Sequence, residues 1–342
     1  MRMGLILRLF IAILFAMTAS AQTNLDRISL GITRITTEAF GKEIPIRIFY
    51  PTSEMAVMTE FGPWKIEAAR NAEIQPGAHP LVLISHGLNG TDWNHHLLAA
   101  ELVRRGFIVA ALQHADDLLR VGHPEQLSIR PLELQSSLDA LLADHKFGAA
   151  IDSQRIGAYG YSAGGYTVLA AAGGQYDYER TRHHCLQNVE LDPNYCIGEP
   201  GGAKLPLVLR LRRSLYRVPP LPETFDVIDT RIRAVVAAAP VGVPFTHMSR
   251  VKQPVLLLRA GEDLELRAPF HVDHIHNLLP HEHQYEIIEG LHHYAFLSPF
   301  PDQIAHDVGE PAKDPEGFDR RAFLAKTNIR IADFFVSHLM EP

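Results

Sequence analysis

Apolar positions along the chain follow two alternating spacings. Short continuous apolar runs predict buried strands, and apolar residues three or four positions apart predict helices that bury one face. Strands are expected at residues 81–85, 107–112, 155–161, 232–239, 254–259 and 284–289, and helices at residues 95–105, 131–142, 163–172 and 320–339. This alternation predicts the α/β class, with a mostly parallel sheet covered by helices on both faces.

Two regions depart from the alternation. Residues 28–51 carry Ile44, Ile46 and Ile48 at period two, which predicts half-buried antiparallel strands at one edge of the sheet. Residues 173–230 are longer than an ordinary crossover, and we interpret them as a cap-like insertion rather than a disordered loop.

The first residues have the pattern of a secretory signal. Residues 1–21 place arginines before an apolar run and end in the small residues Ala19-Ser20-Ala21. Cleavage after Ala21 would leave residues 22–342 as one domain, secreted or periplasmic, without a membrane span. An uncleaved anchor is the alternative.

Composition and charge narrow the choice of partner. The chain has 46% hydrophobic residues, enough for a sizeable core, and a net charge of -7. That charge argues against a dedicated nucleic-acid binder, which needs a broad cationic face. Export would let Cys185 and Cys196 persist as a disulfide, with two free thiols as the alternative.

The stretch around Ser162 carries the main chemical signal. Gly160-Tyr161-Ser162-Ala163-Gly164 stands where a predicted strand ends and a small-residue helix begins, which is the context of a nucleophile elbow. Glycines on both sides let strand and helix approach the tight turn that presents the Ser162 hydroxyl. The backbone N–H of Ala163 is then one expected oxyanion donor.

A second donor is expected from an earlier loop. Residues 85–90, Ser-His-Gly-Leu-Asn-Gly, follow the strand at 81–85, where serine hydrolases of this topology place an oxyanion loop. We assign the backbone N–H of Leu88, against the alternative of a simple glycine turn. His86 is interpreted as structural, because the base is expected after the nucleophile in chain order.

The acid and the base should follow Ser162 on loops after later strands. Asp263 comes after the strand at 254–259, and His293 comes after the strand at 284–289. The order serine, aspartate, histidine is the one that this topology predicts. His293 would accept the Ser162 proton, and Asp263 would fix its tautomer.

Both assignments have neighbouring alternatives. The acid often lies three residues after such a glycine, where this chain has Leu264, so Glu262 and Glu265 compete with Asp263. His292 competes with His293.

With these residues assigned, a family resemblance can be named. The chain resembles the predicted dienelactone hydrolases of the α/β-hydrolase superfamily, the group related to platelet-activating-factor acetylhydrolases, from about Ile44 to the last helix. The resemblance implies that Ser162, Asp263 and His293 are nucleophile, acid and base of an esterase, and the group's shorter glycine-to-acid spacing favours Asp263. A dienelactone substrate is not implied, because typical dienelactone hydrolases have cysteine in place of Ser162. The segments that carry the resemblance are residues 82–87, 160–167 and 293–297.

The remaining polar clusters receive ordinary interpretations. The histidines at 271, 274, 276, 281 and 283 lack metal-ligand spacing and are expected on a solvated surface, so no metal or cofactor is predicted. Leucines between 205 and 215 are expected to pack inward as part of a cap. The arginines between them, at 210, 212, 213 and 217, offer contact with an anionic surface as the alternative.

The sequence thus predicts a secreted serine esterase that acts through an acyl-enzyme on a small-molecule ester with a modest apolar chain. The insertion at 173–230 is expected to cap the site and select the substrate. An amidase or peptidase of the same fold and a non-catalytic binding protein are the alternatives, since fold does not decide substrate.

Overall fold

The structure, a computed structural model, describes residues 28–39, 41–115, 125–197, 227–280 and 282–340. Within those ranges, no helix is both long enough and apolar enough to cross a membrane. The predicted signal peptide, residues 1–21, and the leucine- and arginine-containing stretch at 205–217 lie outside the described residues.

A central sheet organises the molecule. The strand order is β12-β11-β9-β7-β5-β6-β2-β1-β4-β3, and the strands from β12 to β6 are parallel to one another. Side chains of the central strands β5, β6, β9 and β11 and of the second half of β7 are largely buried on both faces, which explains the apolar runs in their sequences, whereas the edge strand β12 is partly exposed. These strands are β5 (His79–Ser85), β6 (Ile108–Leu112), β7 (Ile151–Tyr161), β9 (Ile232–Ala238), β11 (Val255–Ala260) and β12 (Gln284–Ile288).

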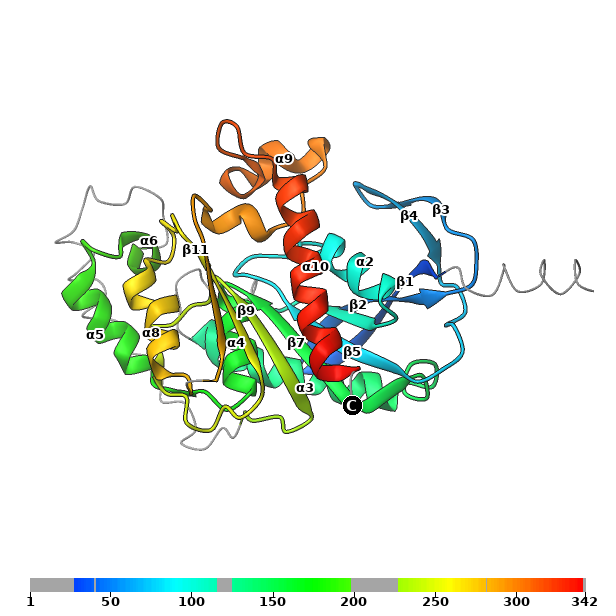
Figure 1. The fold of residues 1–342 in the computed structure, drawn as a ribbon, viewed down its shortest axis with the longest axis horizontal. Coiled ribbons are helices and arrows are strands. Elements are labelled where there is room, and N and C mark those ends of the chain that lie inside the picture. The colour runs from blue at the N-terminus through cyan, green and yellow to red at the C-terminus, as the bar shows by residue number, and fades with distance from the viewer. Residues whose placement is uncertain (1–27, 40, 116–124, 198–226, 281, 341–342) are drawn as a thin grey trace, which may run out of the picture.

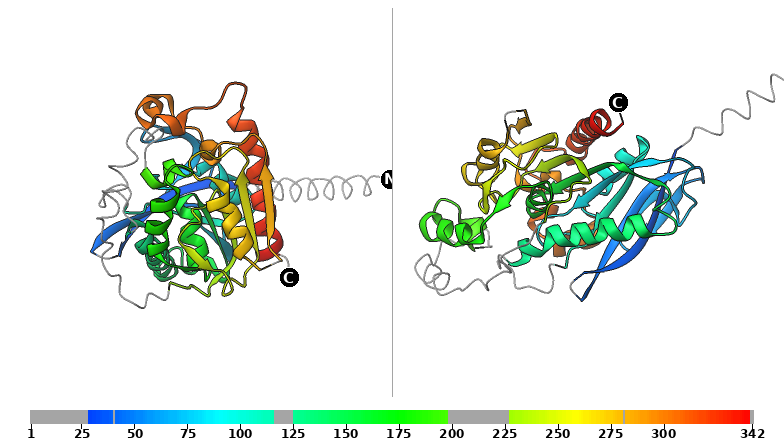
Figure 2. Two further views of the ribbon diagram at one scale, coloured as in Figure 1. Left: turned by 90° about the vertical axis from the view of Figure 1, so that its left-hand side faces the viewer. Right: turned by 90° about the horizontal axis from the view of Figure 1, so that it is seen from below.

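Helices cover both faces of this sheet (Figure 1). α2 (His96–Arg104) and the long α10 (Arg320–Leu339) bury leucines and phenylalanines against one face. α3 (Glu125–Ala143), α4 (Ala163–Ala171) and α8 (Val272–Leu278) cover the other. The turned views in Figure 2 show the sheet between the two layers. This arrangement is the α/β-hydrolase fold, which confirms the predicted fold class.

The predicted antiparallel strands are present at the sheet edge. β1 (Ser29–Ala39) and β2 (Lys42–Thr52) pair in register, and β2 joins the parallel strands through β6. A second hairpin, β3 (Val57–Phe61) and β4 (Trp64–Arg70), extends this edge and was not predicted.

The start of α3 differs from the prediction. Pro131 does not open this helix but lies inside it, one and a half turns after Glu125. Proline cannot donate the hydrogen bond to the carbonyl four residues earlier, yet its fixed φ is helical, so the helix continues through it.

The described part of the insertion is ordered by short elements and a disulfide. β8 (Gln175–Tyr176) pairs with β10 (Phe245–His247), and α5 (Tyr178–Asn188) and α6 (Pro193–Ile197) follow β8. Cys185 and Cys196 form the predicted disulfide between the two helices. We call residues 177–196 the disulfide segment. The remaining elements are α9 (Asp302–Val308) and 3-10 turns at Ala268–Phe270, His293–Phe296 and Glu310–Ala312.

Candidate active site

Ser162 occupies a strained turn between β7 and α4. Its φ of 56° lies in the left-handed region, which residues other than glycine rarely adopt. A Cβ on Gly160 would lie 2.0 Å from the Gly164 carbonyl oxygen, and one on Gly164 would lie 1.9 Å from that of Ser85. Only glycine fits at either position, so the local sequence permits the sharp turn that lifts the hydroxyl from the sheet.

Three side chains that are distant in sequence form a hydrogen-bonded chain. The Ser162 Oγ lies 3.1 Å from His293 Nε2, and His293 Nδ1 lies 2.7 Å from Asp263 Oδ2. The other Asp263 oxygen accepts the N–H groups of Glu265 and Leu266 at 2.9 and 2.8 Å. These bonds aim the carboxylate at His293, whose Nδ1 donates to it and whose Nε2 is left to accept the hydroxyl proton.

The neighbouring alternatives lie elsewhere. His292 has 40% of its side chain exposed, and its Nε2 lies 3.6 Å from Glu262 Oε2, whereas the contact with Ser162 is made by His293. Glu265 forms a hydrogen bond with Tyr294 and lines the cavity beside the site; burial, together with the nearby Asp263 charge, raises its pKa.

The two expected oxyanion donors come from different parts of the chain. Ala163 begins α4, and Leu88 lies within the short turn in which the Gly90 N–H donates to the Gly87 carbonyl at 3.1 Å. Leu88, Ser162 and Ala163 all line one cavity. A helix N-terminus adds a partial positive charge where a negative oxygen would develop.

That cavity has a volume of about 630 Å³. Most of its wall is apolar, and Thr181, Asn194 and Tyr195 of the disulfide segment contribute to it. The described part of the predicted cap therefore contributes to the cavity wall. The apolar lining comes from residues far apart in sequence: Trp64, Leu88, Leu127, Tyr161, Tyr195, Val241, Leu266, Leu297, Phe300, Ile304 and Val308.

Sequence reasoning missed the support given by Tyr161. Its hydroxyl donates to the His293 carbonyl at 3.2 Å, and its ring lies 5.0 Å from the imidazole, centroid to centroid. Because Tyr161 is adjacent to Ser162 in the chain, one residue links the elbow to the loop that carries His293. The position of Tyr161 next to the elbow serine is the sequence feature that could have indicated this supporting role.

The prediction of a solvated surface is wrong for His271. This side chain is buried, and its Nε2 lies 2.9 Å from Asp192 Oδ2, the same oxygen that faces His184 Nε2 at 2.9 Å. Burial opposes the charge on Asp192, but the hydrogen bonds from both histidines lower its pKa to about 2. The histidine pattern alone gave no sign of this carboxylate, which lies 79 positions away.

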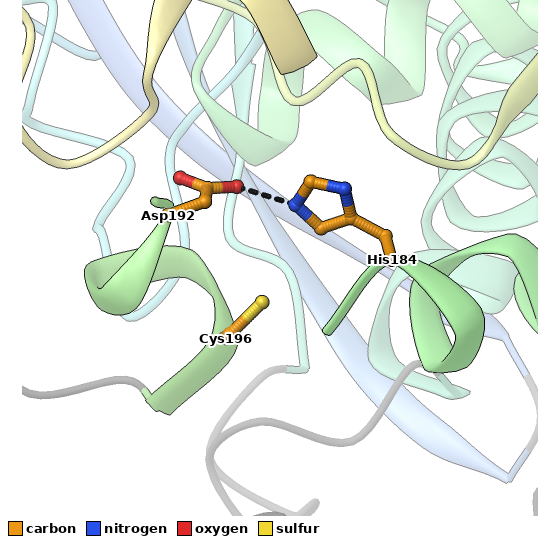
Figure 3. Close-up of side chains that lie close together, drawn as sticks. All are labelled: His184, Asp192 and Cys196. Atoms are coloured by element: carbon orange, nitrogen blue, oxygen red, sulfur yellow. Dashed lines mark hydrogen bonds and ion pairs between the residues drawn. The ribbon is translucent and has the colours of Figure 1, made fainter. Parts of the chain in front are cut away.

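His184, Asp192 and Cys196 lie close enough to suggest a metal site (Figure 3). The hydrogen bonds oppose that interpretation. The side-chain NH₂ of Asn188 donates to Nδ1 of His184 at 3.3 Å, so the proton of this ring is on Nε2 and points at Asp192. A histidine binds a metal through an unprotonated ring nitrogen, and the nitrogen that faces Asp192 carries the proton. Cys196 is in the disulfide and has no thiolate to offer. The cluster anchors the disulfide segment to α8.

Comparisons with known proteins agree with the resemblance. The family described as "Platelet-activating factor acetylhydrolase, isoform II" matches residues 44–121, which include the loop at residues 85–90. A platelet-activating factor acetylhydrolase from Cavia porcellus is 26% identical over 202 residues, which are 46% of this chain and 45% of that protein. The chain thus matches somewhat less than half the length of this curated relative, and the two are related in sequence.

Among solved structures, a ferulic acid esterase from Streptomyces cinnamoneus is similar. The comparison gives a TM-score of 0.62 at 17% identity and covers 92% of this chain and 91% of the other. At that identity the likeness supports the fold.

Proposed function

We propose that this protein is a serine esterase that hydrolyses small carboxylic esters, with Ser162 as nucleophile, His293 as base and Asp263 as the orienting acid. The observation that carries the proposal is the hydrogen-bonded chain from Ser162 Oγ through His293 to Asp263, at 3.1 and 2.7 Å. The sequence relationship to platelet-activating factor acetylhydrolases supports the same class of reaction.

The geometry accommodates acyl transfer in two steps. Ser162 Oγ attacks the ester carbonyl carbon while its proton moves to His293 Nε2, and the carbonyl oxygen becomes negative between the N–H groups of Leu88 and Ala163. The intermediate collapses, and the departing alkoxide takes the proton from His293. Water then attacks the acyl-enzyme by the same route, which releases the acid and restores the Ser162 hydroxyl.

Ser162→Ala is the direct test. We expect it to abolish labelling by a fluorophosphonate and to reduce ester turnover by orders of magnitude, since only binding and the oxyanion hole remain. Ser337→Ala is the matched control, because it removes a serine hydroxyl from α10 instead. This variant should keep both the fluorophosphonate labelling and the ester turnover. Turnover of the Ser162 variant within about tenfold of wild type would refute the assignment.

The cavity supports a small substrate with a modest apolar chain. Its volume of about 630 Å³ and apolar wall suit a short acyl or alkyl group. p-Nitrophenyl esters of graded length, with matched anilides, would measure both preferences. We expect kcat/KM to be highest for short to medium esters; faster cleavage of the anilides would move the protein to the amidases.

Export through the signal at residues 1–21 is also proposed. The Cys185–Cys196 disulfide supports it, because such bonds persist in oxidising compartments. N-terminal sequencing of protein from the periplasm or medium should begin at Gln22. A product that begins at Met1 in the membrane fraction would indicate an uncleaved anchor instead.

A further inference from the structure

A buried guanidinium lies beneath the oxyanion loop. Arg130 of α3 is 0% exposed, and its Nη2 donates to the carbonyl of His86 at 2.8 Å and to that of Gly87 at 3.3 Å. One cation therefore holds two consecutive peptide carbonyls of the loop. The acyl-transfer steps described above do not use Arg130.

His86 adds a second donor to the same peptide. The backbone N–H of His114 donates to His86 Nε2 at 3.0 Å, so the ring proton is on Nδ1, which donates to the Gly87 carbonyl at 2.6 Å. Burial, and after it the Arg130 charge, hold the pKa of His86 well below its usual value. The ring therefore stays neutral, and the Gly87 carbonyl oxygen accepts from His86 and Arg130 in addition to the Gly90 N–H of the turn.

A further hydrogen-bonded chain holds His114. Ser85 Oγ lies 2.8 Å from His114 Nε2, and His114 Nδ1 lies 2.6 Å from Glu133 Oε2. This repeats the order of groups at Ser162, but Ser85 is 0% exposed and His114 and Glu133 are each 1% exposed. Substrate does not reach this serine, so the chain supports the loop rather than forming a second active site.

The hydrogen bonds to the Gly87 carbonyl determine the direction of the Leu88 N–H. In a planar trans peptide, the carbonyl of one residue and the N–H of the following residue point in opposite directions. Gly87 O is turned toward Arg130, so the Leu88 N–H is turned away from it. The Tyr161 ring also packs closely against Gly87 and limits the movement of this peptide, since a Cβ on Gly87 would lie 2.9 Å from the ring.

We propose that Arg130 is the positioning residue of the oxyanion hole: through the Gly87–Leu88 peptide it aims the Leu88 N–H at the oxygen that becomes negative. Its positive charge at the carbonyl end also polarises this peptide and strengthens the N–H as a donor. The inference rests on the proposed esterase and adds a residue to its site.

Arg130→Met keeps an unbranched apolar stem, although a shorter one, and removes the charge and the donors. We expect kcat to fall about 10- to 100-fold with KM little changed, because the donor matters most when the oxygen carries charge. Affinity for a trifluoromethyl ketone, whose adduct places an oxyanion at this position, should fall by a similar factor. Arg155→Met is the matched control: it also loses a bond to a backbone carbonyl, that of Ala78 at 2.8 Å, but lies early in β7. It should keep wild-type kcat.

A spectroscopic measurement tests the peptide itself. Labelling glycine with ¹³C at the carbonyl and leucine with ¹⁵N selects Gly–Leu peptides, which occur at residues 4–5, 87–88 and 290–291. The 87–88 signal should move in Arg130→Met while the 290–291 signal stays. If that variant does not fold, Arg130→Lys takes its place, because the lysine side chain is one atom shorter and its ammonium does not reach the position of Nη2. A reduced kcat and a shift of the 87–88 signal are again expected.

A folded Arg130 variant with kcat within about threefold of wild type, or with an unmoved 87–88 signal, would overturn the proposal. Failure of the esterase assignment has a different signature: wild-type protein would show no ester turnover and no labelling of Ser162, whatever the peptide signal reports. The catalytic role of Arg130 would then fall with it.

Discussion

At the scale of single residues, two carboxylates next to one histidine have different surroundings. Asp263 receives two backbone N–H groups on one oxygen and His293 on the other. Glu265 instead bonds to Tyr294 and lines the cavity, and burial raises its pKa. Position relative to His293 Nδ1, rather than acidity, separates the orienting group from its neighbour.

Asp263→Asn should therefore cost far more activity than Glu265→Gln. The backbone N–H groups would keep the asparagine oxygen in place and turn its NH₂ toward His293 Nδ1, which forces the proton of the ring onto Nε2. That nitrogen then cannot accept the Ser162 proton, and kcat should fall roughly 10³- to 10⁴-fold. Glu265→Gln should stay within about tenfold of wild type. The reverse order, measured on a p-nitrophenyl ester, would make Glu265 the acid.

The two adjacent histidines give a parallel prediction. His293→Gln should lose most turnover, whereas His292→Gln should keep it, because the His292 side chain faces Glu262 and solvent. In a Ser162→Ala background, His293→Gln should add little further loss, since triad members act as a unit. Equal losses from the two single changes would contradict the choice of base.

At the scale of elements, the disulfide segment is closed by one covalent bond and attached to the start of α8 by the contact between Asp192 and His271. The Cys185–Cys196 bond joins α5 to α6, and Asp192 joins both to α8 through His184 and His271. Thr181, Asn194 and Tyr195 of the same segment form part of the cavity wall. The order of this segment is thus coupled to the shape of the cavity.

Replacing both cysteines by serine should loosen this segment more than the sheet. Closing a loop of this length contributes roughly 2–3 kcal/mol in the chain-entropy account. Amide hydrogen exchange should accelerate in residues 178–197 and stay unchanged in β5 and β7. Longer esters should lose kcat/KM more than acetate does. Unchanged exchange in residues 178–197 would mean that the Asp192 contacts alone hold the segment.

At the scale of the whole molecule, buried neutral histidines make stability depend on pH. Burial lowers the pKa of His95 to about 3 and that of His96 to about 4, and it also lowers the pKa of His86 and His271. In the unfolded chain these groups titrate near pH 6.5. Below that pH the unfolded state binds more protons than the folded state, so stability falls as the pH falls.

The free energy of unfolding in urea should therefore decrease from pH 7 to pH 5. His95 alone should contribute about 1–2 kcal/mol to that decrease, from about 1.4 kcal/mol per pH unit below its unfolded pKa. His95→Gln should flatten the slope by this amount, and His145→Gln, at a side chain 96% exposed, should leave it unchanged. A slope identical in the His95 variant and wild type would contradict the assignment.

The local sequence pattern was sufficient to predict the order of strands and helices and the position of the nucleophile elbow. The central parts of β5, β7 and β9 are apolar because strands covered on both faces have no polar side there. The glycines at 160 and 164 are required by contacts within one turn and its neighbouring strand. Such constraints act over few residues, so the sequence displays them. The alternating order of strands and helices carried the fold class for the same reason.

Only the tertiary structure distinguished the candidate acid and base from neighbouring residues with the same chemical groups. Asp263 and Glu265, or His292 and His293, differ by which way a loop turns, and that depends on strands and loops far away in sequence. Arg130 shares the helix face of Leu134 and Leu138, which was a faint signal, but its partners His86 and Gly87 lie 44 and 43 positions earlier. Asp192 and His271 are 79 positions apart and meet only when α8 packs against the disulfide segment. Hydrogen bonds over such separations leave no periodicity in the chain, because direction and distance in space, not spacing in sequence, create them.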